Sequence, residues 1–508
     1  MRLNILIGGK AGQGINKLSE IISEVLVKQG YFIFSYRDYQ SLIRGGHNFN
    51  IISISDKWIG SHESEIDGIV AFDDLTLEKH KSKLKKNNFV IQSKGFENLG
   101  RNLNLAFAGA LVKVFGINKN VLVEIIKKEF NNQEALSAVD KGFNGQKEKF
   151  NLKKLNNNNI SIINGSQGVS QGSINSGINL HFSYPMTPAT GVLDNLALRE
   201  LDIKSLKVFQ PENEIAVINN AIGASFAGAK VLVGTSGGGF DLMTEALSFQ
   251  GMAEIPLVVY LASRPGPGTG IPTYTCQSDL DVAVKAGHGE FPRVVIAPGD
   301  PIECIETTNE AFYLAEKFST LSIILSDKHL AESGYSHDKK PNKTLNVEIK
   351  RKLPGNAIVK ANSYEHDKQQ NTTESPEIAS ANADARIKKY EQIKKECEKF
   401  DMIKIHGKKD SKNLIIGWGS TKGAILDAIK DIDCKFLQVI YMKPMSNKIR
   451  DEINKAKKVI IIEQNSTGQL GRLIREKTGI KIDNRILKYD GLPFTSDELN
   501  KEIKKVMK

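Results

Sequence analysis

The sequence predicts an α/β protein made of several domains. The chain has 508 residues, which is enough for three or four ordinary domains with a core each. Short apolar runs alternate with segments of helical length and pattern through most of the chain. Such alternation is typical of parallel sheets that helices cover on both faces. Hydrophobic residues make up 40% and charged residues 25%, which are normal values for a globular protein.

The first domain is expected over residues 1–150. Its first apolar run, residues 4–7, leads through a glycine-rich turn into an amphipathic helix. The apolar side of that helix consists of Leu18, Ile21, Ile22, Val25 and Leu26. Further strands are expected at residues 31–36, 50–53, 68–72 and 89–91. The polar residues 147–159 have the composition of a linker and end this domain.

Two more domains are expected beyond the linker, at residues 151–335 and 405–508. The first of them alternates helices with strands at residues 179–183, 231–234, 257–261, 294–297 and 321–325. Residues 336–404 are polar and charged, and we expect a connecting segment that is helical near its end, at 384–400. The last domain repeats the β–α pattern, with strands at 413–416, 436–440 and 459–462.

The net charge of +11 suggests nucleic acid as one possible partner. However, the basic residues are scattered and no nucleic-acid motif accompanies them, so we expect a lysine-rich surface and no nucleic-acid partner. A positive field would also attract an acidic partner or a phosphorylated cofactor. No apolar run approaches the roughly 20 residues that cross a membrane, and the first residues lack the pattern of a secretory signal. We therefore expect a cytoplasmic protein without a membrane partner.

The four cysteines, Cys276, Cys304, Cys397 and Cys434, lie far apart in the sequence. They form no C-x-x-C pair, which argues against an iron–sulfur cluster or a zinc site in this chain. In a cytoplasmic protein the simplest expectation is four reduced thiols. We therefore name no metal-binding residue.

Three loops of the second domain follow predicted strands directly, at residues 184–188, 235–239 and 264–270. In an open parallel sheet, ligands bind beyond the carboxyl ends of the strands. Arg264 can hold a carboxylate with two parallel hydrogen bonds, and Thr187 lies in a proline-rich turn that restricts its hydroxyl. These residues suit a small anionic substrate. A stiff surface loop whose arginine pairs with a structural aspartate explains the same pattern equally well.

Two glutamates, Glu212 and Glu214, lie at the start of a predicted helix after Pro211. Proline at the first helical position and glutamate in the first turn are ordinary stabilising choices, so both can be structural. The rest of this helix is rich in alanine and glycine, which would let another backbone, such as that of a second subunit, approach closely.

The first domain has a glycine-rich turn, residues 8–14, between a strand and a helix. Backbone N–H groups in this setting can hold phosphate, which makes Gly12 and Gly14 candidate cofactor-binding residues. The turn matches neither the dinucleotide fingerprint nor the Walker loop. Arg44 belongs to a second flexible basic loop, in which His47 is a better candidate for a hydrogen-bonding role than for catalysis.

Taken together, these segments resemble a known family: the alpha subunits of 2-oxoacid:ferredoxin (acceptor) oxidoreductases, in the form with a gamma domain fused ahead of the alpha domains. The resemblance spans nearly the whole chain, and its segments occur in the family's order. They are GGKAGQG, IRGGHNFN, YPMTP, QPENEIAVINNAIGASFAGA, TSGGGFDLMTEAL, RPGPGTGIPT, HGEFPR, NSYEHD and EQNSTGQLGRLIREKTG. Three positions depart from the common pattern, namely Lys10, Met186 and Gly238.

The resemblance implies a gamma-type α/β domain, then a parallel-sheet domain like the pyrimidine-binding domains of thiamine-diphosphate enzymes, and finally a domain like the C-terminal domain of transketolase. It also implies coenzyme A-dependent oxidative decarboxylation of a 2-oxoacid, with electrons passed through an iron–sulfur centre to ferredoxin. Thiamine diphosphate would be shared with a beta subunit, which would hold the magnesium ion and the 4Fe-4S cluster.

Residue roles follow from the same resemblance. Glu214 would bind the aminopyrimidine of thiamine diphosphate and activate it, with Glu212 as the alternative. Thr187 and Arg264 match substrate-binding positions, and Tyr184, Thr269 and Thr273 are further candidates for that pocket.

Two other functions remain open: a subunit of a non-redox thiamine-diphosphate enzyme, which would not need the first domain, and a catalytically silent scaffold. Which 2-oxoacid is used also stays open. The stretch around His366 resembles the 2-oxoglutarate type.

Overall fold

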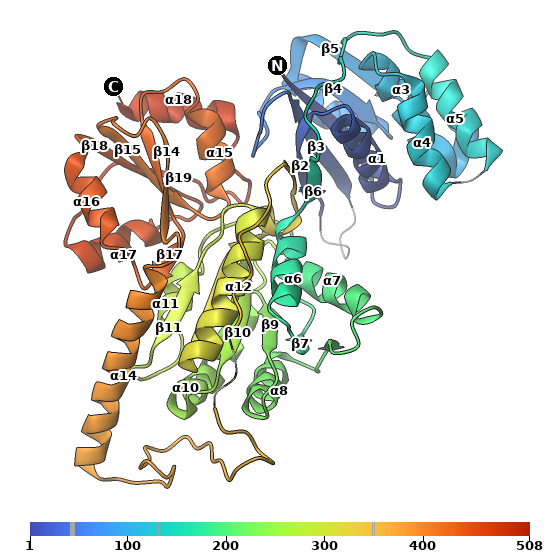
Figure 1. The fold of residues 1–508 in the computed structure, drawn as a ribbon. Helices are drawn as coiled ribbons and strands as arrows, with labels where there is room; N and C mark the ends of the chain where they lie inside the picture. Colours follow the sequence, from blue (N-terminus) through green and yellow to red (C-terminus); the bar gives the residue numbers. More distant parts are fainter. Residues whose placement is uncertain (41–45, 131, 348, 350, 508) are drawn as a thin grey trace. The chain divides into compact units, whose positions relative to one another are not determined.

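The computed structural model describes residues 1–40, 46–130, 132–347, 349 and 351–507, and its fold is α/β, as predicted. The chain forms two compact units. The first unit consists of Met1–Ile163, Ser333–Lys339 and Phe494–Lys501, and the second holds the remainder. Figure 1 shows the course of the chain through both.

The first unit is built on a seven-stranded mixed sheet of order β5-β4-β1-β3-β2-β13-β6. Its strands are β1 (Arg2–Lys10), β2 (Phe32–Asp38), β3 (His47–Ser55), β4 (Ile66–Ala71), β5 (Leu84–Gln92), β6 (Ser161–Ile163) and β13 (Gly334–His337). All five strands expected before residue 150 are present, and β1 pairs antiparallel with β3 and parallel with β4. The sheet also includes β6 and β13, which come from segments that composition placed outside the first domain.

Helices cover both faces of this sheet. They are α1 (Ile15–Lys28), α2 (Asp74–His80), α3 (Leu103–Val114), α4 (Lys119–Glu129), α5 (Gln133–Asn144) and the short 3-10 helices η1 (Lys81–Lys83) and η2 (Glu97–Asn102). The predicted apolar side of α1 is buried. Figure 1 shows α3, α4 and α5 together, and α3 and α5 approach so closely that a side chain at Gly142 would meet the backbone of Ala106.

The second unit contains two sheets. The larger has the order β17-β11-β12-β10-β9-β7-β8 and is parallel except for β17. Its strands are β7 (Leu180–Ser183), β8 (Lys207–Phe209), β9 (Val231–Thr235), β10 (Leu257–Ser263), β11 (Arg293–Ile296), β12 (Leu321–Asp327) and β17 (Tyr441–Lys443). Its helices are α6 (Gly165–Asn175), α7 (Thr190–Glu200), α8 (Glu214–Phe226), α9 (Gly237–Leu242), α10 (Thr244–Ala253), α11 (Leu280–Lys285), α12 (Pro301–Phe318) and α13 (Lys328–Glu332).

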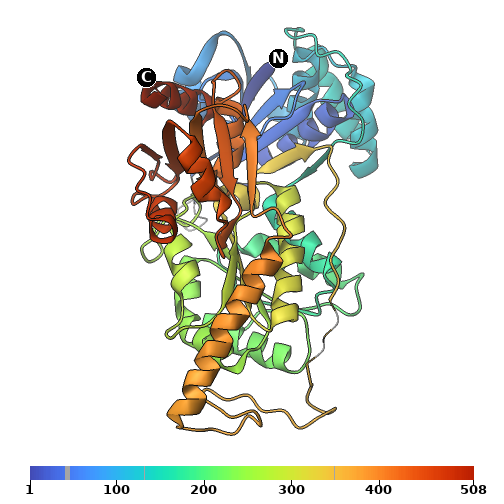
Figure 2. The ribbon, with the colours of Figure 1, turned by 60° about the vertical axis from the view of Figure 1, so that its left-hand side comes forward.

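The smaller sheet has the order β14-β16-β15-β18-β19. Its strands are β14 (Ile403–Gly407), β15 (Asn413–Trp418), β16 (Lys435–Val439), β18 (Lys458–Glu463) and β19 (Arg485–Leu487). The helices of this region are α14 (Pro376–Cys397), α15 (Thr421–Ala428), α16 (Lys448–Lys455) and α17 (Gln469–Thr478). The last helix, α18 (Ser496–Met507), belongs to the first unit up to Lys501 and to the second unit after it. The long helix α14, orange in Figure 2, ends the connecting segment. In the described part of the chain, no helix is long and apolar enough to cross a membrane.

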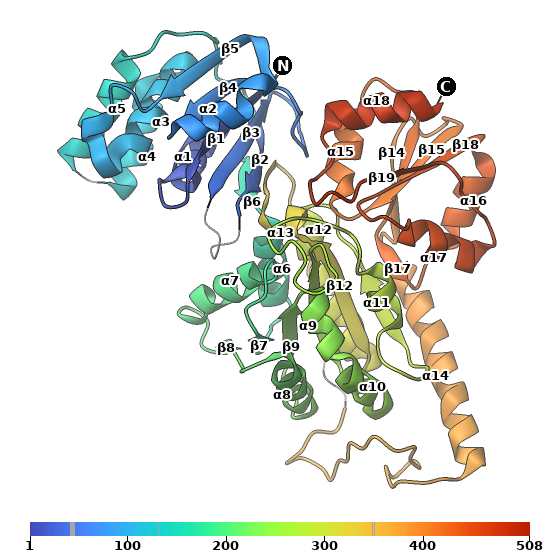
Figure 3. The ribbon, with the colours of Figure 1, turned by 180° about the vertical axis from the view of Figure 1, so that it is seen from behind.

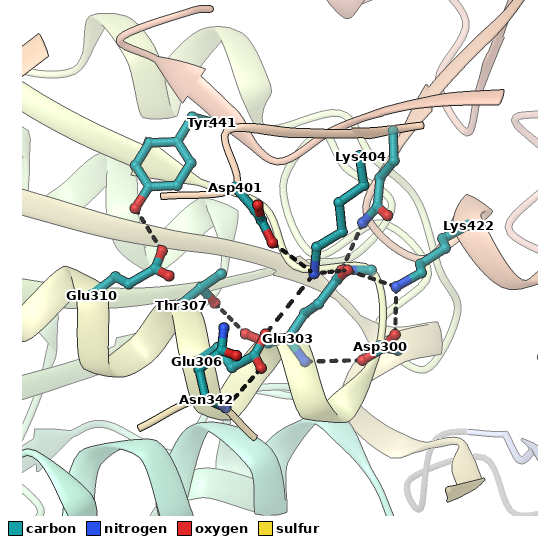
Figure 4. Close-up of polar contacts among 12 residues, drawn as sticks. Asp300, Glu303, Glu306, Thr307, Glu310, Asn342, Asp401, Lys404, Lys422 and Tyr441 are labelled. Carbon is teal, nitrogen blue, oxygen red and sulfur yellow. Dashed lines mark hydrogen bonds and ion pairs between the residues drawn. The ribbon is translucent and has the colours of Figure 1, made fainter. Parts of the chain in front are cut away.

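A buried polar cluster joins α12 to the smaller sheet. We call it the Glu303 cluster; it consists of Asp300, Glu303, Lys404, Lys422 and Gln438. Figure 4 labels the first four of these residues. The Lys422 Nζ lies 2.6 Å from Glu303 Oε1, and Gln438 Nε2 donates to Glu303 Oε2 at 2.6 Å. Burial alone would raise the pKa of Glu303, but the two lysines and the hydrogen bonds lower it to about 2. The cluster therefore places a fully charged carboxylate inside the second unit.

Candidate active site

Parallel strands bring the three predicted loops to one edge of the larger sheet. The strands β10, β9 and β7 are direct neighbours, and Ser183 is in register with Gly234 while Leu261 is in register with Thr235. The loops that begin at residues 184, 236 and 264 therefore leave the sheet side by side, as the alternation of strands and helices predicted. Figure 3 shows β7, β9 and the helix α9 in this region.

Arg264 and Thr187 lie in contact. The Arg264 Nη1 donates a hydrogen bond to the backbone oxygen of Thr187 at 3.0 Å. Burial lowers the pKa of Arg264, while the nearby carboxylates Asp279 and Glu214 act in the opposite direction. An arginine that is only half-buried keeps its charge, so this guanidinium can still bind an anion with its other N–H groups.

Glu214 is the first residue of α8 and is only 4% exposed. The preceding residue, Asn213, caps the helix by accepting a hydrogen bond from the Ala216 N–H at 2.9 Å, so Glu214 is not the capping residue. Its Oε1 is buried and has no hydrogen-bond partner among the described residues. Glu212, in contrast, is exposed. Burial thus makes Glu214 a better candidate than Glu212 for a ligand-binding residue.

The first turn of α9, which follows β9 almost directly, packs against Glu214. A β-carbon built at Gly239 would lie 2.6 Å from Glu214 Oε1 and would also collide with the Thr235 hydroxyl. At Gly238 a β-carbon would meet nothing closer than 4.0 Å. The glycine at position 239 therefore gives the carboxylate of Glu214 the space that it occupies.

Sequence reasoning missed Asp279, which lies beside this loop. Its Oδ2 is buried without a partner among the described residues and lies 2.7 Å from the position of a β-carbon at Gly237. Burial raises the pKa of Asp279. The residue directly precedes α11, where an aspartate is ordinarily explained as a helix cap, so its position in the sequence gave no signal of another role.

Several buried polar atoms at this edge of the sheet lack a partner among the described residues. Besides Glu214 Oε1 and Asp279 Oδ2, they are the hydroxyls of Ser236 and Ser263. The carboxylate of Asp279 and the hydroxyl of Ser263 are close enough to interact with each other, so Glu214 Oε1 and the Ser236 hydroxyl are the better candidates for contact with a bound molecule, since buried polar groups are rarely left without a hydrogen bond. This donor and acceptor set fits a polar, nitrogen-bearing ring such as an aminopyrimidine.

The remaining predicted residues stand apart from these contacts. Tyr184 is 38% exposed, Thr269 is exposed and Thr273 is buried. Hydrogen bonds described for the chain do not join these three side chains to Arg264 or Glu214. Their assignment to the substrate pocket stays a prediction.

In the first unit, Gly12 and Gly14 form the turn between β1 and α1. Both have a positive φ, 88° and 89°, which favours glycine. The turn is closed by Gln13, whose Oε1 accepts from the Lys10 N–H at 2.7 Å. His47 is buried and its Nε2 lies 2.9 Å from the Nε2 of His80, a hydrogen-bonding role as predicted. Arg44 lies outside the described residues.

Family comparisons agree with this architecture. Residues 171–401 match the family described as "Pyruvate flavodoxin/ferredoxin oxidoreductase, thiamine diP-bdg", and residues 4–100 match "Pyruvate ferredoxin/flavodoxin oxidoreductase". The chain is 28% identical to the 2-oxoacid:ferredoxin oxidoreductase subunit alpha of a Sulfolobus species, over 100% of this chain and 97% of the relative. It is 42% identical to the 2-oxoglutarate synthase subunit KorA of Archaeoglobus fulgidus, over 34% of this chain and 51% of that one.

A solved structure, the 2-oxoglutarate:ferredoxin oxidoreductase from Magnetococcus marinus with 2-oxoglutarate, coenzyme A and succinyl-CoA bound, matches all of this chain and all of its own. The TM-score is 0.91 and the identity is 27%. Fold and site together define an α/β oxidoreductase subunit with a thiamine-diphosphate-binding domain. More closely, the chain is similar over its whole length to 2-oxoacid:ferredoxin oxidoreductase alpha subunits, and residues 4–100 are the part that matches the second oxidoreductase family model.

Proposed function

We propose that this chain is the alpha subunit of an enzyme that converts a 2-oxoacid and coenzyme A to acyl-CoA and CO2, and passes the two electrons released to ferredoxin. The observation that carries the proposal is the buried Glu214, whose Oε1 is unpaired next to the contact of Arg264 with Thr187. The family match and the bound ligands of the Magnetococcus marinus structure support the same reaction.

Each of these three side chains would have a separate task. Glu214 would accept a hydrogen bond from the aminopyrimidine ring of thiamine diphosphate. When bound, that cofactor supplies the nucleophilic carbon for decarboxylation. Arg264 would bind the substrate carboxylate through the N–H groups that Thr187 does not use. Thr187 would orient the carbonyl, and Tyr184, Thr269 and Thr273 would line the rest of the pocket.

A partner chain completes this proposal. We expect a beta subunit that holds the diphosphate, the magnesium ion and a 4Fe-4S cluster, since the four cysteines of this chain are separate, buried, free thiols. An apolar groove beside α8 supports a partner, because Phe209 and Ile215 line it and are 47% and 52% exposed. In the first unit, Gly12, Gly14 and Arg44 are proposed to bind phosphate groups of a cofactor.

For the substrate we propose 2-oxoglutarate first. The Magnetococcus marinus structure contains this compound, and the relative at 42% identity is a 2-oxoglutarate synthase subunit. A non-redox thiamine-diphosphate enzyme is less well supported, because residues 4–100 match an oxidoreductase family as well. Purification from the native source should yield a second chain with iron, sulfide and thiamine diphosphate. If this chain is always purified without a second chain, the proposal is contradicted.

Replacement of Arg264 tests the substrate site. For Arg264→Ala we expect the KM for 2-oxoglutarate to rise by about 100-fold, because a charged pair with the carboxylate is lost, while thiamine diphosphate binds as before. Steady-state kinetics and cofactor titration of the purified complex measure both quantities. Arg475→Ala, on the exposed face of α17, is the control and should change neither. Equal weakening of substrate and cofactor binding would assign Arg264 a structural role.

A further inference from the structure

The second unit contains a cavity of about 240 Å³ that lies away from the candidate active site. Segments of α11, α14, β17, α16 and α17 line it, and Figure 3 shows these elements near the upper end of α14. Lys443 in its wall is in register with Val295, two residues after the start of β11. Val295 is in register with Ile323 near the start of β12, so Lys443 lies level with the amino-terminal half of the sheet, whereas Arg264 follows the carboxyl end of β10, which runs parallel to β12.

Positive charge dominates the wall of this cavity. Its cationic residues, which we call the cavity cations, are Lys285, Lys394, Lys443, Arg450 and Lys477. The single carboxylate among the described lining residues is Glu476, which lies 2.9 Å from Lys477 and 3.9 Å from Lys285. Lys394 lies 3.8 Å from Glu391, which is outside the lining, so Lys443 and Arg450 are the cavity cations for which the described residues provide no carboxylate partner.

Two of the cavity cations bond only to backbone oxygens among the described residues. Lys443 Nζ donates to the oxygen of Val284 at 3.2 Å, and Arg450 Nη2 donates to the oxygen of Thr478 at 3.3 Å. A neutral carbonyl leaves the full charge of each cation in place. Both side chains can therefore bind an anion in the cavity without first giving up a carboxylate partner.

A further cation increases the local excess. Arg293 is 3% exposed, and its Nε and Nη1 have no partner among the described residues. Burial lowers the pKa of Lys443 to about 8, and Arg293, Lys477 and Lys285 lower it in the same direction against Glu476. Cations that depress one another's pKa in this way gain free energy when an anion binds between them.

We propose that this cavity binds a small anion that carries phosphate groups. A phosphate ester has a charge of about −1.5 to −2 on one centre, so two phosphates match the excess of cations in a space of this size better than one carboxylate does. The phosphates can belong to a free metabolite or to coenzyme A, and their chemistry is the same. The assignment is independent of the catalysis proposed for Glu214 and Arg264.

Inorganic pyrophosphate is the probe for this site. Titration calorimetry on the purified complex should detect its binding at low ionic strength, and Lys443→Gln with Arg450→Gln should weaken that binding by about tenfold or more, because two charge-assisted contacts are lost. The control is Lys408→Gln with Lys504→Gln, which removes the same charge from two exposed surface pairs with Asp433 and Asp431. This control should bind pyrophosphate within about twofold of the wild type.

Further outcomes decide the proposal. Lys477→Gln, a single change at the more exposed side of the cavity, should weaken binding by about threefold without affecting folding. Competition by coenzyme A would identify its phosphates as the source, whereas no competition would identify a free phosphorylated compound. No binding of pyrophosphate to the wild type, an equal loss in the control, or equally tight binding of citrate at the same ionic strength would overturn the assignment.

Discussion

Gly239 leaves room for the carboxylate of Glu214 and for the Thr235 hydroxyl. We expect Gly239→Ala to displace that carboxylate, since a β-carbon there would lie 2.6 Å from Glu214 Oε1. A misplaced catalytic group costs about 100-fold in rate, so kcat should fall by about that factor. Kinetics of the purified complex measure the change. Gly238→Ala is the matched control, because a β-carbon meets nothing closer than 4.0 Å there, and its kcat should stay near the wild-type value.

Glu214 and Glu212 differ in burial and therefore in the expected effect of the same substitution. Glu214→Gln keeps the shape of the side chain but removes its charge, so turnover should fall by about 10²- to 10⁴-fold while the complex stays assembled. Glu212→Gln changes an exposed side chain and should leave turnover unchanged. Measured rates in the opposite order would move the catalytic role to Glu212.

Candidate residues of the site could be chosen from the sequence where they follow predicted strands directly. Arg264 and Thr187 follow predicted strands directly, and parallel pairing of those strands brings them into contact. The family resemblance favours Glu214 over Glu212, and the structure adds that Glu214 is buried and Glu212 exposed; the catalytic role itself stays a prediction. Asp279 was not predictable, because its sequence position is that of a helix cap.

The helix α12 also contains Glu310, whose side chain is half-buried. The Tyr441 hydroxyl donates to Glu310 Oε2 at 2.6 Å (Figure 4). Burial raises the pKa of Glu310 from its ordinary value of 4.5 to about 7, although the hydrogen bond from Tyr441 acts against this rise. The folded protein therefore holds a proton here that the unfolded chain has already released between these two pH values.

This difference predicts how stability depends on pH. Between about pH 4.5 and 7 the folded state binds more protons than the unfolded state, so the contribution of Glu310 to stability falls as the pH rises. The full change is about 3 kcal/mol. Glu310→Gln cannot titrate, so we expect it to match the wild type near pH 4 and to exceed it by up to about 3 kcal/mol above pH 7.

Urea unfolding at several pH values tests this prediction. In a Trp58→Phe background the fluorescence of the buried Trp418 follows the second unit alone. Glu391→Gln is the control, since Glu391 is an exposed residue of α14. A stability difference between wild type and Glu310→Gln that does not vary with pH would contradict the assignment of this titration to Glu310.

Among the elements, long periodic ones were predicted and short ones were not. Each strand expected from the sequence is present, whereas β8, β17 and β19 have three residues each, too few for a pattern. The start of α14 was placed at residue 384 although the helix begins at Pro376. The signal for this start was available, because Ser375 caps the helix and proline follows at its first position.

At the scale of the whole molecule, the first unit takes one of its strands, β13, from residues far along the chain. Tyr335 of β13 pairs with Phe34 of β2 on one side and Ile163 of β6 on the other. In addition, the Ser336 hydroxyl accepts from the Ile33 N–H at 2.7 Å and donates to the Ile33 oxygen at 2.8 Å. The sequence could not reveal this pairing, because domain limits drawn from composition join only residues that are neighbours along the chain, and β13 lies about 300 residues after β2.

A fragment comparison tests whether the first unit depends on β13. The fragment 1–163 alone should show weak hydrogen-exchange protection of the β2 amides, since β2 becomes an open edge. Attaching residues 333–339 through a glycine–serine linker should restore the protection. The same segment with Ser336→Pro is the control, because proline removes an N–H and the hydroxyl. Equal protection in all three fragments would show that β13 does not stabilise the sheet.

The late position of β13 in the sequence also sets the order of events during synthesis. The first five strands are complete once residue 92 has been made. The sheet does not have all of its strands until residue 337 has left the ribosome. At about 5–20 residues per second, the interval of about 245 residues lasts roughly 12 to 50 seconds. During that time the edge of β2 is exposed to other nascent chains, so this stage of biogenesis is where we expect a chaperone to be needed.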